Sequence, residues 1–178
     1  MDRTDAGGLA ASRGAAVKRR IIVMRHGAAE PATGGLADRA RPLDSRGRRQ
    51  CVEVGQEIER LGWAPDLAMV SPAARTSETW AILADHVGRR VITELQPALY
   101  GGGWWAVREC LGLTDPSVGT VIVVGHNPGL EEVVLEATGF SISLGTANAA
   151  LLAGAGRSWP GALREGRWKL MARVVPTA

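Results

Sequence analysis

The sequence predicts an α/β domain of three layers, in which helices flank a mostly parallel central sheet. Two short runs rich in β-branched residues, 21–24 and 120–124, are typical of parallel strands that are buried on both faces. Segments with helical patterns alternate with these runs and with weaker strand candidates. This alternation indicates a layered α/β domain rather than an all-α or all-β protein.

The strands follow from local patterns along the chain. The run 66–70 stops at Ser71-Pro72, and 90–93 is a shorter β-branched stretch. Near the end, 147–153 is apolar and 167–175 alternates polar with apolar residues, so we expect a late pair of strands with one antiparallel member at a sheet edge. A Gly-rich turn region separates this pair.

Four helices are expected between the strands. Segment 45–61 places Val54, Ile58 and Leu61 on one face, and Asp44 or Ser45 can cap its start. Segment 74–87 has an inner face built around Trp80 and Leu83. The remaining two helices are expected at 104–111 and 130–138.

Composition excludes several classes of protein. The 178 residues carry a net charge of only +3, and the dense basic cluster Lys18-Arg19-Arg20 is too short to favour nucleic-acid binding. No apolar run is long enough to predict a membrane span. Residues 1–18 have no signal-peptide pattern and are expected to form a flexible tail, with a single domain at 19–178.

The two cysteines, Cys51 and Cys110, have neither disulfide-framework nor metal-site spacing. We expect both to fill core positions as small apolar side chains, which suits a reducing compartment. The default location is therefore the cytoplasm. The chain also lacks a metal-ligand set at the usual spacing, so we expect neither a metal nor another cofactor.

Two of the three histidines follow predicted buried strands directly. His26 comes after 21–24, and His126 comes after 120–124, whereas His86 lies in a predicted helix and is expected to be exposed. Ligands of parallel α/β sheets bind beyond the carboxyl ends of the strands. The two histidines are therefore candidates for one site.

Arginines supply the anion-binding part of this prediction. Arg25 adjoins His26, and Arg75 opens the helix after the third strand, where backbone donors favour an anion. Arg41 precedes another predicted helix and is either a loop residue that reaches the same pocket or a solvated surface charge. A guanidinium matches two phosphate oxygens at once. Neutral imidazole is a good nucleophile near neutral pH, and nearby arginines oppose its protonation.

The motifs Val23-Met24-Arg25-His26-Gly27, Ser71-Pro72-Ala73-Ala74-Arg75-Thr76-Ser77-Glu78-Thr79 and Gly125-His126-Asn127-Pro128-Gly129, in that order, resemble the histidine phosphatase superfamily, with its phosphoglycerate mutase-like fold. Together with Arg41-Pro42-Leu43, they resemble its short bacterial phosphohistidine phosphatase (SixA-like) branch. The resemblance implies a phosphatase in which His26 accepts the phosphoryl group and Arg25, Arg75 and His126 complete the pocket. Arg41, Gly27 and Asn127 would bind substrate.

Two departures from the family pattern bear on the substrate. Ala28 stands where an acidic residue commonly follows Arg-His-Gly, and Ala98 falls where many members carry the proton donor for the leaving group. Glu30 and Glu94 are possible substitutes, or neither is. A site without an acid suits phosphohistidine, because imidazole leaves more easily than an alkoxide, and it argues against a phosphoglycerate mutase.

Alternatives remain open at this stage. One is a phosphomonoesterase of small metabolites from the same superfamily, and another is a phospho-ligand binding module without turnover. A nucleotide-binding domain lacks support, since Gly101-Gly102-Gly103 has neither of the usual glycine spacings. Trp104 and Trp105, which follow these glycines, either form a lid or docking face or pack under the next helix.

Overall fold

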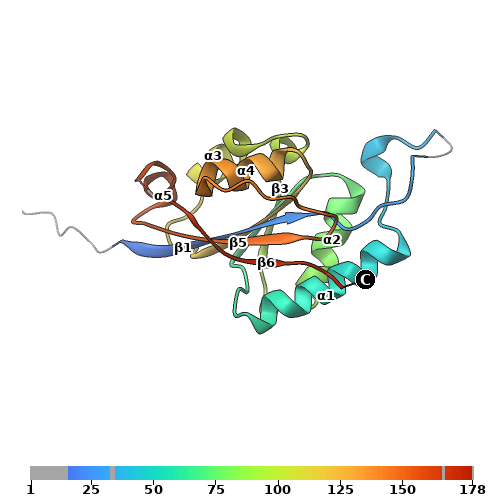
Figure 1. The fold of residues 1–178 in the computed structure, drawn as a ribbon, viewed down its shortest axis with the longest axis horizontal. Coiled ribbons are helices and arrows are strands. Elements are labelled where there is room, and N and C mark those ends of the chain that lie inside the picture. The colour runs from blue at the N-terminus through green and yellow to red at the C-terminus, as the bar shows by residue number, and fades with distance from the viewer. Residues whose placement is uncertain (1–15, 33–34, 166, 178) are drawn as a thin grey trace, which may run out of the picture.

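The computed structural model describes residues 16–32, 35–165 and 167–177. Within them lies one six-stranded sheet, with helices on both faces (Figure 1). The strands are β1 (Val17–Arg25), β2 (Leu67–Val70), β3 (Ile92–Leu95), β4 (Thr120–Gly125), β5 (Ala149–Gly156) and β6 (Lys169–Val174). The helices are α1 (Ser45–Arg60), α2 (Ala74–Ala84), α3 (Trp104–Gly112), α4 (Gly129–Thr138) and α5 (Trp159–Glu165), with 3-10 turns η1 (Asp38–Ala40) and η2 (Pro97–Leu99).

The sheet is mixed but mostly parallel, as predicted. Its order is β3-β2-β4-β1-β5-β6, and the first four of these strands run parallel. Strand β5 is antiparallel to β1, and β6 is antiparallel to β5. The late pair of strands is therefore present, with both members antiparallel to their neighbours.

Alternation along β1 explains the three layers. Ile21 and Val23 pack on the side of α3, α4 and α5, whereas Ile22 and Met24 pack on the side of α1 and α2. All four side chains are fully buried. A strand that is apolar on both faces must be covered on both faces, so the sequence pattern alone requires the helices above and below.

Strand β1 is longer than the predicted 21–24. It begins at Val17, because β5 pairs with it as far as Val17 opposite Gly156. The strand thus enters the segment 1–18 that was predicted to be a tail, and residues 1–15 of that tail lie outside the described residues. Arg19 is buried and donates to the carbonyls of Pro116 and Val118, so this part of the basic cluster is structural.

Helix α5 was missed in the sequence, where its segment was predicted to be a Gly-rich turn. Trp159 and Ala162 on this helix are fully buried, and Pro160 occupies its first turn, where proline is tolerated. The backbone of Ala162 lies so close to Gly156 that a Cβ there would approach within 2.5 Å. The glycines thus serve close packing beside a helix as well as turning.

Other local predictions are confirmed for the helix cap and the cysteines, but wrong for the end of α2 and for His86. Asp44 caps α1, with its carboxylate accepting the Gly47 amide at 2.6 Å. Cys51 and Cys110 are buried free thiols. Helix α2 ends at Ala84, before the predicted boundary at residue 87, and His86 beyond it is half-buried rather than exposed. No helix in the described part of the chain is long and apolar enough to cross a membrane.

Candidate active site

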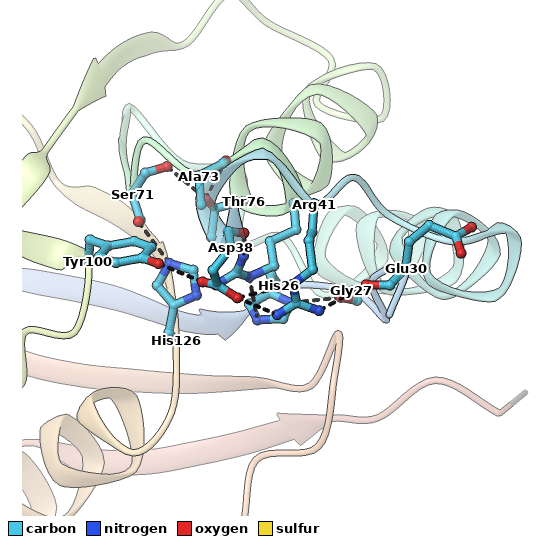
Figure 2. A network of polar contacts seen from close by, with 11 residues as sticks. His26, Gly27, Glu30, Asp38, Arg41, Ser71, Ala73, Thr76, Tyr100 and His126 are labelled. Carbon is cyan, nitrogen blue, oxygen red and sulfur yellow. Dashed lines mark hydrogen bonds and ion pairs between the residues drawn. The ribbon is translucent and has the colours of Figure 1, made fainter. Parts of the chain in front are cut away.

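The structure brings the two predicted histidines together. Strands β1 and β4 are neighbours with Arg25 opposite Gly125, so the residues that follow them, His26 and His126, leave the sheet side by side. Their ring centroids are 5.1 Å apart, with the ring planes at 59°. The carboxyl edge of the sheet therefore carries a pair of imidazoles, as Figure 2 shows.

Hydrogen bonds define the tautomer of His26. Its Nδ1 lies 2.7 Å from the carbonyl oxygen of Gly27, which can only accept, so Nδ1 carries the proton. The Nε–H of Arg75 donates to Nε2 at 3.3 Å. Burial first, and then the charges of the nearby arginines, lower the pKa of His26 to about 4. At neutral pH this imidazole is neutral, and its lone pair is on Nε2.

Gly27 holds the ring of His26 in this orientation. Its amide donates to Oγ1 of Thr79 at 3.0 Å, and its carbonyl accepts from His26. A Cβ at this position would lie 2.8 Å from both the Cys51 sulfur and the Gly47 carbonyl oxygen, so a larger residue does not fit. Gly27 was predicted to bind substrate, which stays a prediction; in this structure its polar groups contact His26 and Thr79.

Arg75 is the most buried of the three arginines at the site. It lies in the first turn of α2, and its side chain is only 6 % exposed. Besides contacting His26, it donates through NH1 to the backbone carbonyl of Asp38 at 2.7 Å and through NH2 to the Asp38 carboxylate at 2.9 Å. An anion near His26 would compete with Asp38 for these hydrogens.

Asp38 was missed by the sequence prediction. Its Oδ1 accepts from Nε and NH2 of Arg41 at 3.0 and 2.7 Å, and its Oδ2 accepts from Arg75 and, at 2.5 Å, from the hydroxyl of Tyr100 (Figure 2). These donors, Tyr100 first, hold the pKa of the Asp38 carboxyl far below its usual range. A carboxylate three residues before Arg41 is the signal that could have identified it.

Arg41 reaches the site from its loop, which was one of the two outcomes left open. It donates to the Glu30 carbonyl at 2.9 Å as well as to Asp38, and its side chain is 21 % exposed. Its charge is among those that lower the pKa of His26. Arg41 therefore belongs to the electrostatic surroundings of the nucleophile.

One ring nitrogen of His126 contacts a hydroxyl, and the other has no partner among the described residues. Its Nε2 lies 2.8 Å from the hydroxyl of Ser71, at the end of β2, and its Nδ1 is buried without a partner among the described residues. The ring of Tyr100 stands edge-on to it at 5.2 Å. Burial first, and then the charges of His26 and Arg75, lower the pKa of His126 to about 4. When Ser71 donates to Nε2, Nδ1–H is a neutral donor to an anion.

Arg25 and Asn127 converge on one backbone carbonyl. NH1 of Arg25 and Nδ2 of Asn127 donate to the oxygen of Leu144 at 2.9 and 2.8 Å. Asn127 also donates to Glu131 at 2.7 Å, so both hydrogen bonds of its amide nitrogen stabilise the loop. The predicted role of Asn127 in binding substrate stays a prediction. Arg25 retains a buried Nε without a partner among the described residues.

The two glutamates considered as proton donors lie elsewhere. The Glu30 side chain points away from the histidines in Figure 2 and is exposed. Glu94 lies in β3, exposed, and accepts from the Gln96 side chain at 2.9 Å. Ala98 is in η2, two residues before Tyr100. The acidic side chain that joins the histidines is therefore Asp38, from a different loop.

The glycine-rich loop packs against the same edge of the molecule. A Cβ on Gly129, at the start of α4, would lie 2.2 Å from the carbonyl oxygen of Gly102, so the two backbones are in close contact. Trp104 packs against the core, while Trp105 is 72 % exposed. Trp104 thus packs against the core, as one of the two predicted alternatives has it, whereas Trp105 is left exposed.

No cluster of three metal-binding side chains occurs among residues 16–32, 35–165 and 167–177. The site as a whole offers guanidinium, imidazole and phenol hydrogens around one imidazole lone pair. This is the equipment of an anion-binding centre with a nitrogen nucleophile. The fold and the site together define a class of α/β proteins that handle phosphoryl or similar anionic groups.

Comparison with known proteins identifies the family. A model described as histidine phosphatase superfamily (branch 1) matches residues 21–99. An uncharacterized chloroplastic protein of Arabidopsis thaliana is 33 % identical over 179 residues, covering 94 % of this chain and 82 % of the relative. The chain belongs to the histidine phosphatase superfamily.

Solved structures agree with this assignment. A Nakamurella multipartita protein assigned as the phosphohistidine phosphatase SixA has a TM-score of 0.77 and 26 % identity, covering 90 % of this chain and 98 % of that one. The protein histidine phosphatase SixA complexed with tungstate has a TM-score of 0.75 and 22 % identity, covering 88 % and 97 %. The latter likeness bears on the fold.

Proposed function

We propose that this protein is a protein phosphohistidine phosphatase that works through a phosphohistidine intermediate on His26. The observation that carries the proposal is the state of His26: a neutral imidazole with its lone pair on Nε2, surrounded by donors that suit a phosphoryl group. A module that only binds phosphate has no need of such a lone pair. The likeness to SixA structures supports the same reaction class.

In the first step, Nε2 of His26 attacks phosphorus while the bond from phosphorus to the leaving nitrogen breaks. The electron pair departs with that nitrogen, and a substrate imidazole protonated at its other nitrogen leaves as neutral imidazole. The phosphorylated His26 ring is then cationic, and the carbonyl of Gly27 keeps hold of its Nδ1–H. Arg75, Arg25 and Nδ1–H of His126 stabilise the charge that spreads over the phosphoryl oxygens.

Asp38 must move away from Arg75 before the phosphoryl group can bind there. Its carboxylate occupies NH2 of Arg75, which the phosphoryl group needs. In the second step water attacks the phosphorus of the intermediate and passes one proton to the solvent. In that second step the N–P bond breaks, its electron pair returns to Nε2, and phosphate is released without a metal or another cofactor.

The ionised state of Asp38 supports a phosphoramidate substrate. A carboxylate whose pKa is held far below its usual range carries no proton at neutral pH, so it cannot protonate an alkoxide leaving group. Neutral imidazole needs no such proton. The alternative, a phosphomonoesterase of small metabolites, would need a donor that the described site does not offer.

The location that we propose is the cytoplasm. The buried free thiols Cys51 and Cys110 support it, since a reducing compartment leaves thiols unpaired. Nucleic acid, membranes and metal ions are not among the partners that we propose.

The test compares a phosphohistidine-containing protein with a sugar phosphate, using His26→Ala as control. We expect turnover of the phosphohistidine protein only, and we expect this activity to be lost in His26→Ala. After brief mixing of the wild type with the phosphohistidine protein, mass spectrometry of digests kept free of acid should find phosphate on His26. Unchanged activity of His26→Ala would overturn the mechanism. Comparable turnover of the two substrates would overturn the substrate class.

A further inference from the structure

We infer that a groove beside strand β3 is the docking site for an extended, basic segment of the substrate protein. The inference rests on the proposed function and extends it from the phosphoryl group to the polypeptide that carries it. The groove encloses about 450 Å³ between the edge of the sheet and α3. It is separate from the histidine pair.

The charge of the groove is of one sign. Its charged lining residues are Glu94, Glu109 and Asp115, and no lysine or arginine lines it. This is a local reversal, since the whole chain has 21 Lys and Arg against 18 Asp and Glu. Burial first, and then the charges of Glu109 and Glu94, raise the pKa of the Cys110 thiol in the same wall, as expected next to concentrated negative charge. A cationic ligand is therefore favoured.

The groove also offers apolar contact. Leu113 is 88 % exposed and Ile92 is 64 % exposed, and both line it. The three carboxylates come from β3, from α3 and from the turn after α3, so they are spread along the groove rather than gathered at one point. Such spacing suits several lysines or arginines along an extended chain better than a single small cation.

Strand β3 supplies a backbone for such a chain to pair with. It is the outer strand of the sheet, it pairs with β2, and all four of its residues are exposed. The amides of Ile92 and Gln96 point towards β2, where they donate to the carbonyls of Asp66 and Val70. By alternation, the amides of Thr93 and Leu95 point outward, which is the geometry for adding a strand.

The groove leads to the catalytic edge. Because β3 is parallel to β2, β4 and β1, its carboxyl end lies at the edge that carries His26 and His126. Ala98 lines the groove, and Tyr100, which contacts His126 and Asp38, comes two residues later, a reach of about 7 Å. A segment seated on β3 can therefore continue towards the nucleophile.

The experiment compares two substrates on two charge variants. The substrates are a phosphohistidine peptide with several flanking lysines, and phosphoramidate itself, which is too small to reach the groove from His26. The test variant is Glu94→Gln with Glu109→Gln, and the matched control is Glu59→Gln with Glu136→Gln, two exposed glutamates that do not line the groove. Thermal melting of both variants checks that they are folded.

We expect kcat/KM for the basic peptide to fall about fivefold in the test variant, mainly through KM, and to stay unchanged in the control. The loss of two exposed ion pairs supports a change of this size. Phosphoramidate turnover should stay within about twofold in both. Salt should weaken the peptide preference of the wild type.

A second variant tests strand pairing. Leu95→Pro removes an outward amide without removing a bond to β2, so the sheet should tolerate it, while peptide turnover should fall and phosphoramidate turnover should not. Equal turnover of lysine-flanked and glutamate-flanked peptides by the wild type would overturn the inference. So would a parallel loss for phosphoramidate in the folded test variant, or a change of oligomeric state with unaltered peptide kinetics, which would make the groove an interface between copies.

Binding of the unphosphorylated lysine-rich peptide to His26→Ala, measured by fluorescence anisotropy, separates this inference from the proposed function. Binding that is lost in the Glu94 and Glu109 variant supports the groove even if no phosphohistidine substrate is turned over. Absent binding overturns the groove even if phosphoramidate is hydrolysed through His26.

Discussion

Replacing Asp38 by asparagine should tighten the binding of inorganic phosphate. The carboxylate of Asp38 occupies NH2 of Arg75 at 2.9 Å, so a phosphate ion must displace it and then share the site with its negative charge. Asparagine keeps the size of the side chain and an oxygen acceptor for Arg41 but removes the charge. The competition for Arg75 is therefore weakened while the loop retains much of its hydrogen bonding.

The size of the effect follows from the exposure of the pair. Asp38 is 50 % exposed although Arg75 is only 6 % exposed, so the pair is best treated in a high effective dielectric. At the dielectric constant of bulk water, about 80, two unit charges 2.9 Å apart attract each other by about 1.4 kcal/mol. This energy corresponds to about tenfold tighter binding of phosphate. The neutral hydrogen bond that asparagine keeps still competes for Arg75, so we expect the binding constant to rise by about fivefold to tenfold.

Calorimetric titration with inorganic phosphate at pH 7.5 and constant ionic strength measures this constant directly. Asp85→Asn is the matched control, because Asp85 is an exposed aspartate at the end of α2 and loses the same charge away from the site. The direction of the change decides between two roles. If Asp38→Asn binds phosphate more weakly than the wild type, Asp38 orients Arg75 for the anion instead of competing with it, and the reasoning is refuted.

Three further results are expected. The rate of phosphoryl transfer to His26 should fall only as pH drops towards 4, its lowered pKa, and stopped-flow measurement of the intermediate between pH 4 and 8 checks this. The pKa of both histidines is near 6.5 in the unfolded chain and about 4 in the folded one. Their contribution to the free energy of unfolding should therefore be complete above about pH 6.5 and should be lost as the pH falls to 4. Urea unfolding of His126→Gln should show a shallower pH dependence. Gly27→Ala should lower the free energy of unfolding by about 1–3 kcal/mol through its clash with Cys51, whereas Gly112→Ala, with open space around it, should not lower it.

The sequence was sufficient for residues whose role depends on strand ends. His26, His126 and Arg75 follow buried strands that are neighbours in a parallel sheet, so topology alone predicts that they meet. Asp38 could not be found that way. Its place depends on a 3-10 turn, on two donors from Arg41 three residues away and on two from the distant Arg75 and Tyr100. The spacing to Arg41 is visible in the sequence, but the long-range pairing leaves no periodic trace there.

Strand β3 shows the same limit in the fold. The strand was predicted two residues too early in the chain, at 90–93 instead of Ile92–Leu95. Interior strands such as β4 are fixed by continuous apolar burial, but all four residues of β3 are exposed, so the hydrophobic pattern does not determine where it begins. The pairing with β2, from Leu67 opposite Ile92, determines it instead.

His26 and His126 follow equivalent strands and have similarly lowered pKa values, yet we propose only His26 as the nucleophile. The difference lies in the partner that each ring meets. His26 meets a backbone carbonyl, which fixes the proton on Nδ1 and leaves the Nε2 lone pair towards Arg75. His126 meets the hydroxyl of Ser71 at Nε2, so the nitrogen that remains for the ligand is Nδ1, a proton donor when Ser71 donates. One carbonyl and one hydroxyl thus leave a lone pair free on one imidazole and a proton free on the other, which suits the separate roles that we propose for His26 and His126.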